Sequence, residues 1–115
     1  METLHFRFEA GPPQEQRRFD ASTGAAAKAT LVGVVGSGNL EVLIEPSTLE
    51  GACTIAITTA ARGFGAIWEA VMRDFHQRWH GDLADVAISI NDMGATPAVV
   101  SLRLDQAVEA MLEQP

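Results

Sequence analysis

A serine between two glycines is the residue of this sequence best placed to do chemistry. The tetrapeptide Gly36-Ser37-Gly38-Asn39 lies between two short apolar runs, 31–35 and 41–44. We expect these runs to form a hairpin with the tetrapeptide at its tip. Glycine allows backbone angles that a Cβ atom prevents, so Gly36 and Gly38 can form a tight turn that presents the Ser37 hydroxyl to a macromolecule. The same residue types also build ordinary hairpin turns, so the tetrapeptide alone leaves both interpretations open.

The residues around Ser37 argue against two glycine-loop functions. Phosphate-binding glycine loops lead directly into a helix whose N-terminal amides bind the phosphate. Here residues 41–46 have the pattern of a strand, and no Gly-Lys-Ser follows the glycines. A hydrolase nucleophile elbow also needs a helix at this point, together with a histidine and an acid elsewhere. The sequence therefore gives little support to nucleotide binding of this kind or to hydrolysis.

His76 and His80 are the best candidates for metal ligands, and the sequence offers them no third partner. They lie four residues apart, near the end of an expected helix, with Gln77 where metalloproteases have a glutamate. No Cys/His cluster accompanies them. We interpret both histidines, with Arg78, as the cations expected in a last helical turn. No metal is expected.

Composition and charge restrict the classes of function. The 115 residues suffice for a single domain, 1–115. A net charge of -7 would repel phosphate backbones and anionic membranes, so we expect no nucleic acid and no membrane as partner. The chain starts without a signal-peptide pattern, no apolar run reaches membrane-spanning length, and the single cysteine allows no internal disulfide. A cytoplasmic protein is expected.

Strands are expected to surround Ser37 in the first half of the chain. Residues 3–9 alternate strictly between apolar and polar side chains, as a half-buried strand does. Residues 10–29 lose this periodicity and are expected to form a flexible loop without chemistry. After the hairpin, residues 52–59 alternate again and turn Cys53 inward, as a small core residue and not a reactive thiol.

One amphipathic helix is the firmest expectation for the second half. Its apolar stripe consists of Phe64, Ile67, Trp68, Val71, Met72, Phe75 and Trp79. A strand at 86–90 and another at 98–104 are expected to follow, joined by the turn 91–97, in which Asn91 and Asp92 can cap amides or face a ligand. Asp105 is then expected to cap a short final helix. The fold class predicted is α+β: a mostly antiparallel β-sheet packed against one long amphipathic helix, with a short C-terminal helix.

Two motifs on either side of the helix resemble those of the acyl carrier subunits of malonate decarboxylases. They are Val34-Val35-Gly36-Ser37-Gly38-Asn39-Leu40-Glu41-Val42-Leu43 and Asn91-Asp92-Met93-Gly94-Ala95-Thr96-Pro97. Leu102-Arg103-Leu104-Asp105-Gln106 matches the end of the strand that follows in the family. The resemblance runs from about residue 30 to the C-terminus. Asn39 replaces the family's usual aspartate, and residues 10–29 look longer than its linker. The citrate lyase carrier subunit is a more distant relative.

The resemblance implies that Ser37 is an attachment point. In the family the aligned serine bears 2'-(5''-phosphoribosyl)-3'-dephospho-CoA through a phosphodiester, on a turn that Gly36 and Gly38 form here. The resemblance implies a non-catalytic subunit whose arm carries acetyl and malonyl thioesters while malonate is converted to acetate and CO2. The implied partners are the malonate decarboxylase catalytic subunits, an acetyl/malonyl transferase subunit and a prosthetic-group transferase. The alternatives are a carrier of the citrate lyase type, a small enzyme and a small non-catalytic interaction module.

Overall fold

Five strands form one mixed sheet in the computed structural model, which describes residues 1–9 and 29–114. The strands are β1 (Glu2–Glu9), β2 (Thr30–Gly33), β3 (Leu40–Pro46), β4 (Ala52–Thr59) and β5 (Val86–Asp92). They lie in the order β1-β4-β5-β3-β2, and each neighbouring pair is antiparallel except β4 and β5. The mostly antiparallel sheet is as predicted. The loop expected at 10–29 falls, apart from Ala29, outside the described residues.

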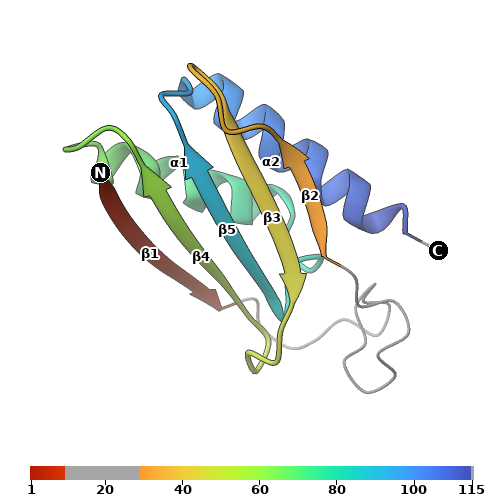
Figure 1. The fold of residues 1–115 in the computed structure, drawn as a ribbon. Coiled ribbons are helices and arrows are strands. Elements are labelled where there is room, and N and C mark those ends of the chain that lie inside the picture. The colour runs from red at the N-terminus through yellow and green to blue at the C-terminus, as the bar shows by residue number, and fades with distance from the viewer. Residues whose placement is uncertain (10–28, 115) are drawn as a thin grey trace.

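Two helices of similar length cover one face of this sheet (Figure 1). The helix α1 (Gly65–Arg78) connects β4 to β5, because parallel neighbours need a crossover connection. The helix α2 (Pro97–Leu112) follows β5 and has 16 residues, against 14 in α1. The α+β class is confirmed. The expectation of one long helix is not confirmed, and that of a short C-terminal helix is wrong. No helix among the described residues has the length and apolar character needed to cross a membrane.

The strand expected at 98–104 is the first half of α2. Thr96 is the N-cap, and its hydroxyl accepts a hydrogen bond from the Val99 N–H at 3.3 Å. Pro97 follows at the start of the helix, where backbone N–H groups have no partner within the helix, so the lack of an N–H in proline costs no hydrogen bond. The buried residues of α2 then recur at helical spacing, as Val100, Leu104, Ala107, Val108 and Met111. Thr96 therefore has the capping role that was expected of Asp105.

Asp105 instead joins the two helices. Its Oδ1 accepts hydrogen bonds from Trp79 Nε1 and from Arg78 Nη2, each at 2.8 Å. Arg78 also pairs with Asp74 one turn earlier on α1. These contacts fix the C-terminal end of α1 against the middle of α2.

The core lies between the sheet and the two helices. The predicted inward faces of β3 and β4 are buried, with Leu40, Val42 and Ile44 on β3 and Cys53, Ile55 and Ile57 on β4. From α1, the side chains of Trp68, Met72 and Phe75 are buried, as the apolar stripe predicted. The predicted apolar stripe begins too early in the sequence, because its first two residues, Phe64 and Ile67, are 48% and 49% exposed.

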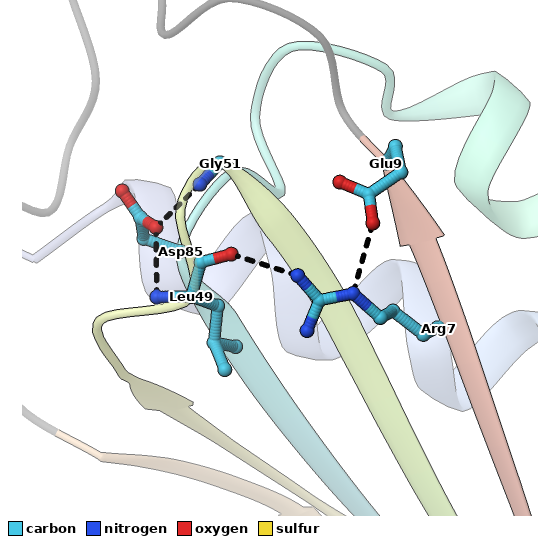
Figure 2. Close-up of polar contacts among 5 residues, drawn as sticks. All are labelled: Arg7, Glu9, Leu49, Gly51 and Asp85. Atoms are coloured by element: carbon cyan, nitrogen blue, oxygen red, sulfur yellow. Dashed lines mark hydrogen bonds and ion pairs between the residues drawn. The ribbon is translucent and has the colours of Figure 1, made fainter.

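Asp85 organises the end of the sheet at which β3 is connected to β4 (Figure 2). Its Oδ1 accepts hydrogen bonds from the backbone N–H groups of Leu49 at 3.1 Å and Gly51 at 2.9 Å. Arg7 of β1 donates to the Leu49 carbonyl at 3.2 Å and to Glu9 at 2.9 Å. The turn between β3 and β4 is thereby bonded both to β1 and to the residue before β5.

Candidate functional site

Ser37 is exposed on the connection between β2 and β3, as the hairpin prediction requires. The Asn39 N–H donates to the Gly36 carbonyl at 3.0 Å and closes a β-turn with Ser37 and Gly38 at its centre. The φ angle of Gly38 is +71°, whereas those of Ser37 and Gly36 are not positive. These are the signs of a type II turn, which favours glycine at its third position. The turn therefore requires a glycine at 38 and not at 36.

The space around the turn is open. A Cβ atom added at Gly36 or Gly38 would meet no other atom within 4 Å. Gly33 is different, because its φ is +88° and an added Cβ would lie 2.2 Å from the Leu40 carbonyl oxygen. The backbones of β2 and β3 therefore come together at Gly33 just before the turn. Sequence reasoning missed this residue, whose only signal was a glycine at the end of a strand.

The structure brings the two sequence motifs together. The Gly38 N–H donates to the Met93 carbonyl at 2.9 Å, and the Met93 N–H donates to the Asn39 carbonyl at 3.0 Å. Both connections lie at the same end of the sheet (Figure 1). The turn 91–97 leads from β5 into α2 and does not join two strands, so the hairpin expected there is absent from the described residues. Its Met93 supports the Ser37 turn instead.

Asp92 fixes the shape of the turn that supports Ser37. Its side chain is 4% exposed. Oδ2 accepts hydrogen bonds from the Thr59 hydroxyl at 2.8 Å and the Gly94 N–H at 3.2 Å, and Oδ1 accepts one from the Ala95 N–H at 2.9 Å. Of the two roles left open for this residue, capping of exposed amides is the one observed.

Asn39 and Arg103 hold the other side of the Ser37 turn. Asn39 Oδ1 accepts hydrogen bonds from the Leu40 N–H at 2.8 Å and from Arg103 Nε at 3.2 Å. An aspartate could accept the same two bonds, so the asparagine at this position leaves the geometry of the turn intact. Arg103 also places a guanidinium beside the turn, where it can offset the charge of a phosphate.

The other candidate residues lie away from Ser37. His76 lies in the last turn of α1 and His80 follows two residues after the helix ends; His76 stacks on Phe8 with 4.9 Å between ring centroids. Burial, and to a lesser degree His80, lower the pKa of His76. In the part of the chain that the structure describes, no three His, Cys, Asp or Glu side chains are grouped to hold a metal ion. Cys53 is buried, as predicted, and burial raises its pKa to about 12.

Comparison with known proteins agrees with the resemblance seen in the sequence. The family model described as "Malonate decarboxylase delta subunit (MdcD)" matches residues 27–111. The malonate decarboxylase acyl carrier protein of Stenotrophomonas maltophilia strain K279a is 57% identical over 112 residues, which cover 97% of this chain and 95% of that protein. Its counterpart in Xanthomonas axonopodis pv. citri strain 306 is 58% identical over 113 residues, 96% of this chain and 95% of the relative.

A solved structure has the same fold. It is the crystal structure of a Pseudomonas malonate decarboxylase hetero-tetramer in complex with malonate, in which one chain superposes with a TM-score of 0.74 at 38% sequence identity. The match covers 96% of this chain and 99% of that one. This chain therefore belongs to the malonate decarboxylase acyl carrier family.

Proposed function

We propose that this acyl carrier subunit bears a 2'-(5''-phosphoribosyl)-3'-dephospho-CoA arm on Ser37, attached through a phosphodiester. The observation that carries the proposal is an exposed hydroxyl on a closed turn with open space at both flanking glycines. Ser37 also lies inside the segment matched by the family model. A transferase can reach such a hydroxyl while the core of the carrier stays undisturbed.

The residues around Ser37 fit a phosphodiester. The turn is bonded to Met93 on one side, and Asn39 is bonded to Arg103 on the other. The attachment point is therefore held at a fixed place relative to the sheet. Arg103 supplies a positive charge next to the turn in a chain whose net charge is -7. Its guanidinium can pair with a phosphate oxygen.

The part played by this chain is to present the attachment point. When attached, the arm would supply a thiol that carries acetyl and malonyl groups as thioesters. Nucleophilic catalysis at Ser37 would need a base hydrogen-bonded to its hydroxyl. Among the described residues, no histidine or carboxylate makes such a bond. The relatives are named acyl carrier proteins, and on that ground we assign this chain a non-catalytic role, in which tethering raises the local concentration of the acyl group near partner sites.

The partners follow from the same proposal. The solved relative is a chain of a malonate decarboxylase hetero-tetramer. We infer that this carrier likewise works with malonate decarboxylase catalytic subunits and an acetyl/malonyl transferase subunit. It would also meet a prosthetic-group transferase once, during attachment of the arm.

Intact-mass measurement of protein from a host that makes the arm tests the proposal. Wild type should carry one increment equal to the arm, and Ser37→Ala should carry none. Ser89→Ala is the matched control, because Ser89 is also exposed but lies within β5; this variant should keep the increment. Both substitutions should change the free energy of unfolding by no more than about 0.5 kcal/mol. An arm on the Ser37→Ala protein would refute the assignment.

A further inference from the structure

An apolar pocket of about 250 Å³ lies at the end of the sheet that carries Ser37. Its walls include Phe64, Ile67 and Trp68 from the start of α1 and Gly94 and Ala95 from the turn after β5. Phe64 and Ile67 are large apolar residues, yet about half of each remains exposed. Exposed apolar side chains around a concave site are typical of a place where a ligand binds.

The pocket and the Ser37 turn share one structural element. Gly94 and Ala95 follow Met93, whose backbone N–H and carbonyl are bonded to Asn39 and Gly38. The turn after β5 therefore supports the attachment point and also forms a wall of the pocket. A group tethered to Ser37 therefore starts from a turn that is hydrogen-bonded to the segment forming this wall.

We propose that the pocket binds the adenine of the arm, an inference that rests on Ser37 as its attachment site. The chemical structure of the arm fixes the order of its groups. One phosphate and one ribose separate the serine from the adenosine, whereas the pantetheine and its thiol come last. Adenine is thus the first planar, largely apolar group along the arm. With the base bound, the nucleotide is anchored and the thiol end stays free to reach partner subunits.

The chemistry of the pocket selects adenine over the other parts of the arm. Phe64, which is 48% exposed, offers an aromatic ring on which a base can stack. The volume is below the roughly 300 Å³ at which sites for drug-sized ligands begin, so it suits a single ring system. The Asp92 carboxylate borders the pocket and would repel the phosphates of the arm and the carboxylate of a malonyl group.

Asp92 can also recognise the base directly. Three hydrogen bonds reach its carboxylate from described residues, and a carboxylate has about four acceptor positions. Oδ1 accepts one of these bonds, so it can accept another from the exocyclic amino group of adenine. The pocket therefore offers both a stacking surface and one polar partner to this base.

A titration of the full-length apo protein, followed by amide chemical shifts in NMR spectra, tests the inference. The probes are adenosine monophosphate, 3'-dephospho-CoA, pantetheine and acetyl-pantetheine. The first two should shift the amide signals of Ile67, Gly94 and Ala95, and the last two should leave them in place. In Phe64→Ala the Kd for adenosine monophosphate should rise by about tenfold, because a stacking ring is lost. Leu31→Ala is the control, since Leu31 is 59% exposed on β2 and does not line the pocket; its Kd should stay within about twofold.

Each other outcome overturns the inference. Shifts caused by pantetheine or acetyl-pantetheine, and not by adenosine monophosphate, would assign the pocket to the acyl end of the arm. An absence of shifts with all four probes would leave the pocket to another occupant, such as a partner subunit. Both results are distinct from failure of the proposed function, which intact mass detects as the lack of an arm on Ser37. In arm-bearing protein, the Gly94 and Ala95 signals should differ from those of Ser37→Ala and resemble those of the nucleotide complex.

Discussion

Alanine substitutions at Gly36 and Gly38 should have opposite effects on stability, although neither side chain meets an obstacle. A Cβ atom at either position has nothing within 4 Å, so steric contact does not distinguish them. Only Gly38 has a positive φ, of +71°. An L-residue in this left-handed region costs about 1–2 kcal/mol. Replacing a glycine of ordinary φ with alanine stabilises by about 0.4–1 kcal/mol, because the unfolded chain loses conformational freedom.

The magnitude expected for each variant follows from these two terms. The entropic gain is common to both alanines and cancels when they are compared. The difference in unfolding free energy between Gly36→Ala and Gly38→Ala should therefore equal the cost of the left-handed φ, about 1–2 kcal/mol. Relative to wild type, Gly38→Ala should be less stable by about 1 kcal/mol and Gly36→Ala more stable by about 0.5 kcal/mol.

Urea unfolding of the apo proteins, with equal m values, measures this difference. Gly38→Asn provides a further check, because asparagine tolerates the left-handed region better than alanine and should recover part of the loss. Equal stability of the two alanine variants, within about 0.3 kcal/mol, would refute the turn assigned here. The rate of arm attachment can be measured on the same samples. Because Gly36→Ala keeps the fold, slower attachment to it would show that the transferase approaches the turn closely.

Three further predictions concern the core. Trp68→Ala should lower the free energy of unfolding by about 3 kcal/mol, because Trp68 is only 7% exposed. A loss below about 1 kcal/mol, measured by urea unfolding, would contradict the place of Trp68 in the core. A maleimide should label Cys53 far more slowly in the native apo protein than in the urea-unfolded protein, because burial raises the pKa of Cys53 to about 12. Rapid labelling of the native protein would contradict the register of β4. The pKa of His76 is lowered in the folded protein, so below the ordinary pKa of 6.5 the unfolded chain binds more protons than the folded chain. Stability that is fully present above pH 6.5 is therefore lost as the pH falls towards the pKa of the folded state. The unfolding free energy should therefore drop less between pH about 7.5 and pH about 5 in His76→Phe than in wild type. An equal drop in the two proteins would show that His76 is not the source of this pH dependence.

The strands could be predicted from the sequence because alternation of apolar and polar residues has one simple structural meaning. Burial alternates at every position of β1, and every second residue is buried from Leu40 to Ile44 in β3 and from Cys53 to Thr59 in β4. The first half of α2 could not be identified in this way, because its run of branched apolar residues fits a buried strand as well as a helix. The decisive signal was local: Thr96 and Pro97 form an N-cap followed by a proline at the first helical position.

The candidate site was predictable only as far as its local geometry. The turn at Ser37 is set by neighbouring residues, so the glycines and the flanking strands reveal it. Its bonds to Met93 depend on the pairing of β3 with β5, which are separated by β4 and α1 in the chain. The sequence also makes Gly36 and Gly38 look equivalent, whereas only the φ angles separate their roles. Long-range pairing and backbone angles are therefore what the sequence left open.

The supports of the Ser37 turn explain why a carrier would place its attachment point at this end of the sheet. The strands β4 and β5 run parallel and end together at the register pair Thr59 and Asp92, which are hydrogen-bonded to each other. Asp92 shapes the turn that carries Met93, and Met93 is bonded to the residues on either side of the Gly38–Asn39 peptide. A hydroxyl on an isolated hairpin tip would move with the tip, whereas this one is connected through two turns to the centre of the sheet. Because a tethered group visits only the sites that its linker spans, a fixed origin would make the reach of the proposed arm the same in each transfer.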